Sequence, residues 1–122
     1  MLKFSFPTRD RLDNMTREER LNLFRQYFAT SRYNRLCIQQ CLVRSAFDDS
    51  LYRKIEEFET QHNKDFSLTL DLLSKYNYKD EFLFAVKEEY EALQKIIDAY
   101  DIRFKMQEYQ LKYLKSESNG NS

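Results

Sequence analysis

The only histidine in the chain is the first residue to consider for chemistry. Glu59 and His62 form a Glu-x-x-His pair, the spacing that places a carboxylate and an imidazole on one helical face in ferritin-like di-metal centres. A complete centre would need two copies of the chain and another glutamate from each, such as Glu88, Glu89 or Glu91. The sequence predicts that a helix ends near residues 61–63, so we interpret His62 as an exposed loop residue. We expect no metal and no cofactor.

The two cysteines are the other candidates for reactive chemistry. Cys37 and Cys41 are four residues apart, so their side chains lie on one helical face, where a disulfide would distort the backbone. Two thiols without a second pair of ligands make a poor zinc site. We therefore predict reduced, half-buried thiols. Because no local motif links His62 to a nucleophile, we predict that the protein is not an enzyme.

Paired carboxylates also occur, and such pairs on a helix usually form solvated surface. Two of them are Glu56-Glu57 and Glu88-Glu89. We expect both pairs to face solvent, and we assign no general acid or base to them.

Arginine and tyrosine residues are interspersed in the first half of the chain. Arginine side chains contact phosphates and tyrosine rings stack on unpaired bases. This pattern suggests a contact with nucleic acid or with an acidic protein. The candidate residues are Arg20, Arg25, Tyr27, Arg32, Tyr33 and Arg35.

Composition restricts the fold that positions these residues. The chain has 122 residues, of which 42% are hydrophobic and 16% aromatic, with one glycine and one proline. Tight hairpins and glycine-built phosphate loops are therefore unavailable, and we predict an all-α fold. No apolar run reaches membrane-spanning length and the first residues do not resemble a secretion signal, so we expect a cytoplasmic protein that does not enter membranes.

The net charge is zero, but the charge is unevenly distributed. Residues 1–54 carry eleven basic and six acidic side chains, a net charge of +5, and the remainder carries −5. The two halves could neutralise each other within the molecule or between two copies, or the basic half could be a recognition surface. The sequence does not decide among these alternatives.

The last third of the chain reads as one long amphipathic helix from about 80 to 116. Two heptad rows form its predicted seam: Val86, Leu93 and Tyr100 in one, and Leu83, Tyr90, Ile97, Phe104 and Leu111 in the other. At about 1.5 Å per residue, roughly 37 residues would extend about 55 Å, whereas a compact chain of this length has a radius of gyration of about 14 Å. The far end of this helix should therefore project, kink or pair with a partner.

The shorter elements are predicted from their start signals. Thr16 and Glu19 form a capping box that begins a helix, and continuity of that helix across Ser31 stays open. Residues 48–50 signal a second helix that ends near 61–63, and Asp65 or Ser67 would begin a short third one. Leu2, Phe4 and Phe6 alternate with polar residues before Pro7, which predicts an extended arm.

These observations predict a four- to five-helix bundle organised on the long C-terminal helix. The arm occupies residues 1–15, one helical domain 16–116 and a flexible tail 117–122. We expect a non-enzymatic adaptor, regulator or inhibitor that acts through protein contacts and self-associates as a homo-oligomer. The alternative is a nucleic-acid-associated accessory protein. The predicted partner-binding residues are Phe4, Phe6, Ile102, Met106, Tyr109 and Tyr113.

Overall fold

The computed structural model describes residues 2–44 and 49–99, and every regular element within these ranges is a helix. The elements are α1 (Arg9–Asp13), α2 (Arg17–Arg44), α3 (Asp49–Lys75) and a 3₁₀ turn, η1 (Asp80–Phe82). The turn leads into a helix at residues 83–99, called the C-terminal helix below. The predicted all-α class is confirmed.

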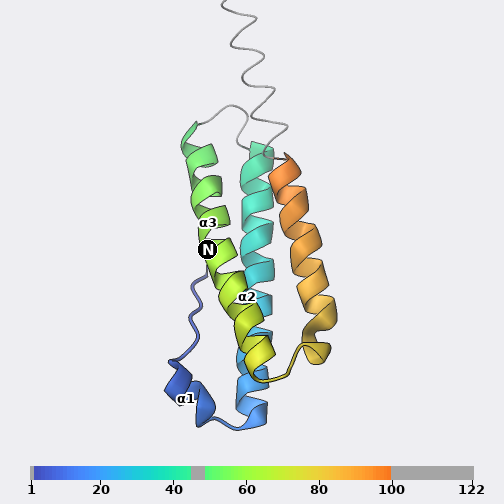
Figure 1. The fold of residues 1–122 in the computed structure, drawn as a ribbon. Helices are drawn as coiled ribbons and strands as arrows, with labels where there is room; N and C mark the ends of the chain where they lie inside the picture. The colour runs from blue at the N-terminus through green and yellow to red at the C-terminus, as the bar shows by residue number, and fades with distance from the viewer. Residues whose placement is uncertain (1, 45–48, 100–122) are drawn as a thin grey trace, which may run out of the picture.

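The three long helices lie side by side and alternate in direction, as Figure 1 shows. Short α1 lies at the base of the bundle, next to the start of α2. The C-terminal helix begins near the predicted position, directly after η1. Its predicted continuation to about 116 and the tail 117–122 lie outside the described residues.

The start of α2 follows the predicted capping box. The Glu19 amide donates to Thr16 Oγ1 over 3.2 Å, and the Thr16 amide donates to Glu19 Oε1 over 3.4 Å. Two amides that lack partners within the helix are thereby satisfied. The helix then runs without a break to Arg44, so Ser31 begins no second helix and its side chain is buried.

The predicted division of the next segment into two helices is wrong, because α3 is continuous from Asp49 to Lys75. No glycine or proline interrupts this stretch. His62, Phe66 and Thr69 are buried at helical spacing, while the polar residues between them are mostly exposed. The segment is therefore amphipathic, and packing of its buried face holds it helical.

Helix α3 ends in a Schellman motif, a C-terminal cap that normally uses glycine in the left-handed conformation. Here Asn77 takes that position, with φ 60°. The Tyr78 amide donates to the Leu73 carbonyl over 2.8 Å and the Asn77 amide to the Ser74 carbonyl over 3.2 Å. Tyr78 and Leu73 also belong to one apolar cluster. The motif reverses the chain at a tight turn without glycine.

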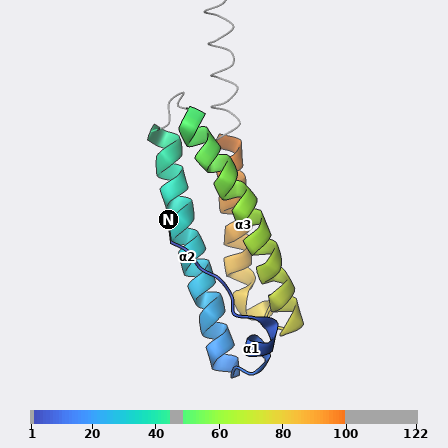
Figure 2. The same ribbon diagram turned by 90° about the vertical axis from the view of Figure 1, so that its left-hand side faces the viewer.

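The N-terminal arm is extended, as predicted, but only over residues 2–8, because α1 follows it. Figure 2 shows the arm running along the bundle from α1. The Asn34 side chain holds the Leu2 backbone through two hydrogen bonds of 2.9 Å. The Phe6 ring packs against Phe24 and Tyr27, with centroids 5.3 and 5.8 Å apart. The arm therefore covers a groove of its own bundle.

The core consists of two apolar clusters at different heights along the bundle. The lower cluster gathers around α1, η1 and the adjoining ends of α2 and α3: Leu12, Leu21, Phe24, Leu72, Leu73, Tyr78 and Phe82. The upper cluster joins the three long helices through Ile38, Ile55, Phe58, Leu93 and Ile96. Along each long helix, the residues between these clusters include buried polar side chains. The core is therefore interrupted by a polar layer.

The face that the C-terminal helix turns toward the core differs from the predicted one. Val86 and Leu93 pack in the core as expected. The second inward row is Phe82, Glu89 and Ile96, all buried, whereas Leu83 and Tyr90 are exposed. The predicted row is therefore wrong at Leu83 and Tyr90, because Phe82 and Glu89 face inward instead, whereas Ile97 of the same row packs against the upper cluster.

Candidate functional site

The most unusual group in the structure is a carboxylate at the centre of the polar layer. Glu89 is only 1% exposed. Its Oε2 lies 2.9 Å from Arg35 Nε, and its Oε1 lies 3.3 Å from His62 Nε2. The Ser31 hydroxyl donates to the same Oε1. Side chains from α2, α3 and the C-terminal helix therefore meet at one buried charge.

Two opposing effects set the protonation of Glu89. Burial by itself raises the pKa of this carboxyl, because a charge is poorly solvated in the interior. The hydrogen bonds from His62 and Ser31 and the positive charge of Arg35 outweigh burial, so the pKa lies below its ordinary value. Glu89 is therefore an ionised acceptor, and the sequence-based expectation that the Glu88-Glu89 pair faces solvent is wrong for Glu89.

His62 is buried rather than exposed in a loop, which corrects the sequence interpretation. Its side chain lies between Phe58 and Phe66, with ring centroids 5.5 and 5.8 Å away. Since ionised Glu89 only accepts hydrogen bonds, Nε2 of His62 must carry the proton that it donates. Glu89 orients the ring, and Glu59 of the Glu-x-x-His pair takes no part in this described contact.

Four buried polar atoms in and beside this cluster have no hydrogen-bond partner among the described residues. Arg35 Nε and Glu89 Oε2 still form an ion pair with each other, whereas Nδ1 of His62 and the hydroxyl of Tyr27 have no such pairing. Burial raises the pKa of Tyr27, and the nearby Thr69 and Ser31 hydroxyls oppose that shift. A buried polar group without a hydrogen-bond partner lowers the stability of a protein. The interior at this position therefore differs from a purely apolar core.

The predicted Arg and Tyr group does not form one surface. Arg35 and Tyr27 are buried, while Arg25, Arg32 and Tyr33 are exposed. Arg35 is committed to Glu89, so it is not available to nucleic acid. Half of the six predicted residues therefore remain accessible. These three, Arg25, Arg32 and Tyr33, all lie on α2.

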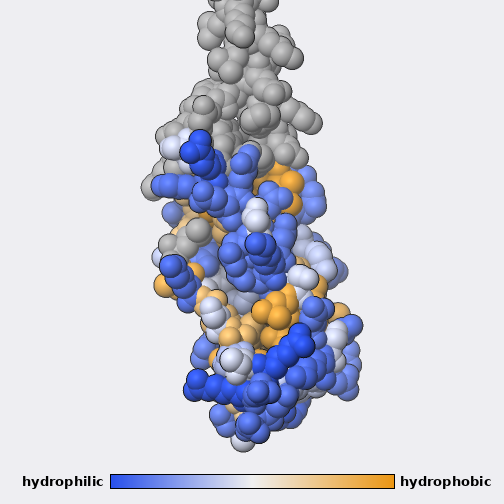
Figure 3. Space-filling model, turned by 60° about the vertical axis from the view of Figure 1, so that its left-hand side comes forward, coloured by the Kyte–Doolittle hydropathy of each residue, from blue (hydrophilic) through white to orange (hydrophobic). Residues whose placement is uncertain are grey.

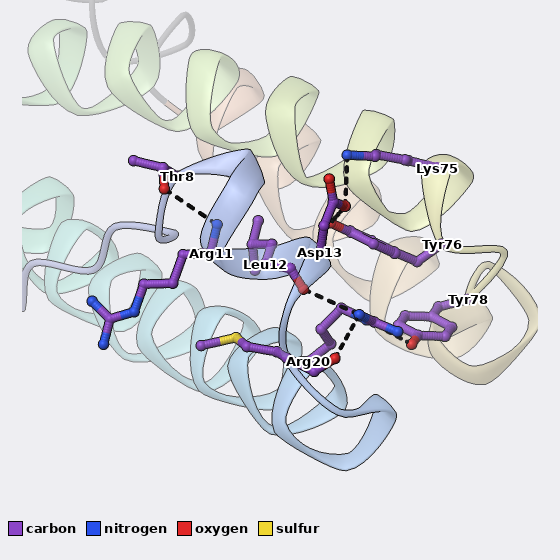
Figure 4. Close-up of polar contacts among 9 residues, drawn as sticks. Thr8, Arg11, Leu12, Asp13, Arg20, Lys75, Tyr76 and Tyr78 are labelled. Carbon is purple, nitrogen blue, oxygen red and sulfur yellow. Dashed lines mark hydrogen bonds and ion pairs between the residues drawn. The ribbon is translucent and has the colours of Figure 1, made fainter.

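Arg20, the sixth member, has a structural role that Figure 4 shows. Its guanidinium donates to the carbonyls of Leu12 and Met15 over 3.1 and 2.8 Å and to the Tyr78 hydroxyl over 3.0 Å. It also lies 4.6 Å from the Tyr76 ring centroid. Arg20 thereby ties α1, α2 and the turn after α3 together at the base of the bundle.

The predicted partner-binding residues are placed only in part. Phe4 and Phe6 are half-buried against the chain's own aromatic residues. The remaining four, Ile102, Met106, Tyr109 and Tyr113, lie outside the described residues. The arm therefore has an intramolecular contact, and the distal row stays a prediction.

The C-terminal helix exposes large apolar side chains that sequence reasoning did not select as contact residues. Phe84 is 80% exposed, Leu83 66% and Tyr90 55%. The heptad pattern predicts Leu83 and Tyr90 in the buried seam and gives no role to Phe84. Because Glu89 faces the core, the helix turns Leu83, Phe84 and Tyr90 outward. The signal that could have identified these exposed side chains is therefore the inward position of Glu89.

Cys37 and Cys41 are free, half-buried thiols, as predicted. Within residues 2–44 and 49–99, no three His, Cys, Asp or Glu side chains are grouped to hold a metal ion. None of the helices in these ranges is both long and apolar enough to cross a bilayer.

Comparisons with protein-family models, curated proteins and solved structures gave no match.

Proposed function

We propose that this protein acts without catalysis, as an adaptor, regulator or inhibitor that works through protein contacts and self-associates. The observation that carries the proposal is the exposure of Leu83, Phe84 and Tyr90 on the C-terminal helix. Exposed apolar side chains that cluster on one element are typical of interaction surfaces. Aromatic residues in particular contribute strongly to protein interfaces.

A second copy of the chain is the proposed occupant of this surface. Charged residues of both signs, such as Lys87 and Glu91, accompany the apolar side chains on the same helix. An antiparallel copy can pair these charges while it covers the apolar residues, as a twofold symmetric interface requires. The polar cluster supports a non-catalytic role, since Glu89 and not a nucleophile is the partner of the only histidine.

Light scattering across a concentration series tests self-association. We expect the native chain to form a dimer and Phe84→Ser to shift it toward monomer without loss of helical circular dichroism. Leu36→Ser is the matched control, because Leu36 is also exposed but lies on α2. A native chain that stays monomeric throughout, or an equal effect of both substitutions, would contradict the proposal.

A further inference from the structure

A cavity of about 760 Å³ lies between α2, α3 and the N-terminal arm. The side of the molecule that carries the arm comes forward in Figure 2, and Figure 3, turned the same way through a smaller angle, shows apolar surface between charged side chains. None of residues 83–99 belongs to the lining of this cavity. The cavity is therefore separate from the apolar side chains proposed for self-association, which belong to the C-terminal helix.

Charged side chains form the outer edge of the cavity. Lys3 of the arm and Lys54 and Glu57 of α3 are exposed, and Asp65 is half-buried. These two positive and two negative charges balance, and solvent screens exposed charges, so the edge does not favour a ligand of either sign. It does open the cavity to water, which provides the entry path that a metal site requires.

Four uncharged polar side chains of the lining already have partners within the chain. Asn34 is hydrogen-bonded to the Leu2 backbone and Gln61 to Asp65. Ser31 and His62 both contact Glu89. These four groups are therefore committed to the fold, and the groups in the lining with distinctive chemistry are the thiols.

Both cysteines of the chain face this cavity from α2. Cys37 and Cys41 are free, half-buried thiols, and both belong to the lining. Residues four apart on a helix have their Cβ atoms about 5–6 Å apart, whereas a disulfide needs Cβ atoms about 3.5–4.5 Å apart. The spacing instead suits one ion between the two sulfur atoms, because two metal–sulfur bonds of about 2.3 Å in line separate the sulfurs by about 4.6 Å.

The number of available ligands decides which ion suits this pair. Structural zinc takes four ligands, and within residues 2–44 and 49–99 no three His, Cys, Asp or Glu side chains are grouped for a metal. His62 supplies no third ligand, because its Nδ1 is buried and its Nε2 donates to Glu89. Copper(I) is a soft ion that thiolate ligands select, and two sulfur ligands in line satisfy it.

We propose that Cys37 and Cys41 bind one copper(I) ion between their sulfur atoms, on the side of α2 that faces the cavity. Each thiol releases its proton to solvent as its thiolate binds the ion. Copper stays in the +1 state, so binding needs no oxidant and no reductant. The site lies within one chain and does not depend on the proposed self-association.

Anaerobic titration of the reduced full chain with copper(I) tests the proposal, with bicinchoninate as a coloured competitor for the ion. We expect the native chain to withdraw one ion per chain from the competitor. Cys37→Ser and Cys41→Ser should each lower the affinity at least about 100-fold, because even groups that only support a metal ligand contribute about 10–100-fold. Helical circular dichroism of each variant confirms that it folds.

The matched control is Gln39→Cys combined with Cys41→Ser, which keeps two thiols in each chain. Gln39 is exposed on α2, and residues two apart on a helix do not face each other. This control should therefore bind copper(I) no more tightly than Cys41→Ser alone.

X-ray absorption at the copper edge provides a second measurement that does not depend on any variant, and it should show two sulfur neighbours and no nitrogen neighbour. No transfer of copper(I) from the competitor to the native chain would overturn the proposal, as would equal affinities of the native chain and the Gln39→Cys control. Half an ion per chain, or full affinity in a mixture of Cys37→Ser and Cys41→Ser chains, would locate the ion between two copies and overturn it as well.

Discussion

Arg35 and Glu89 form an ion pair at mid-height in the bundle, with Nε and Oε2 2.9 Å apart and both side chains buried. The pair links α2 to the C-terminal helix between two apolar clusters. Buried ion pairs contribute little net stability, since desolvation offsets the attraction, but loss of one partner is costly. We therefore infer that Glu89 sets which face of the C-terminal helix turns inward.

Replacement of Glu89 should be far more damaging than replacement of its neighbour. We expect Glu89→Ala to lower the free energy of unfolding by about 3–5 kcal/mol, because it leaves the Arg35 charge buried and unpaired. Glu88→Ala removes only an exposed pair with Arg32, at 3.9 Å, and should cost at most about 1 kcal/mol. Urea unfolding followed by circular dichroism measures both values.

The paired replacement Arg35→Met with Glu89→Leu distinguishes an uncompensated charge from simple loss of volume. It should recover most of the stability that Glu89→Ala loses, because no charge is then left alone in the core. Similar stabilities of Glu89→Ala and Glu88→Ala would show that Glu89 is not buried as described.

The same carboxylate should make stability depend on pH in the acid range. The Glu89 pKa is lowered in the folded state from an ordinary value of 4.5, so the unfolded chain binds the proton more readily. Its stabilising effect is therefore complete above about pH 4.5 and is lost as the pH falls through the folded-state pKa. The difference in unfolding free energy between the native chain and Glu89→Gln should shrink from pH 6 to pH 3.

Asp13→Asn provides a comparison for the pH experiment. Hydrogen bonds from Tyr76 and Lys75 lower the pKa of Asp13 in the same direction, but Asp13 is exposed, so solvent weakens its contribution. The stability difference between the native chain and this variant should vary less with pH. A pH-independent difference between the native chain and Glu89→Gln would contradict ionised Glu89 in the folded protein.

The sequence predicted those parts of the fold that depend on local signals. The capping box at Thr16 and Glu19, the extended arm and the start of the last helix near Asp80 follow from residues close together in the chain. The all-α class follows from the near absence of glycine and proline. These features need no knowledge of how the helices pack.

The predictions are wrong where contacts between residues far apart in the sequence determine the structure. Nothing near Glu89 in the sequence shows that Ser31, Arg35 and His62 will contact it, so the sequence predicts a loop at His62 and a solvent-exposed carboxylate at Glu89. The first assignment follows from the false break predicted in α3, and the second accompanies the wrong face predicted for the C-terminal helix. One available signal was the recurrence of Phe82, Glu89 and Ile96 at intervals of seven residues.

The turn after α3 should tolerate glycine better than alanine. Asn77 has φ 60°, a conformation that costs a residue with a Cβ atom about 1–2 kcal/mol, and asparagine accepts it more readily than alanine. We expect Asn77→Ala to destabilise the protein by about 1 kcal/mol and Asn77→Gly to leave stability equal or higher. Thermal unfolding measures the change.

Asn63→Ala is the control for this pair, since Asn63 is exposed within α3 and alanine favours a helix by up to about 0.7 kcal/mol. It should therefore be neutral or slightly stabilising. Loss of stability in Asn77→Gly comparable to that in Asn77→Ala would mean that the Asn77 side chain, and not its backbone conformation, maintains the turn.

Arg20 should not be replaceable by lysine, although the substitution keeps the charge. Its guanidinium reaches two carbonyls and the Tyr78 hydroxyl at once, which a single ammonium group cannot reproduce with the same geometry. We expect Arg20→Lys to lower the unfolding free energy by about 1.5–3 kcal/mol. Arg25→Lys, on an exposed side chain of the same helix, should change it by less than about 0.5 kcal/mol. Equal effects would show that Arg20 acts only through its charge.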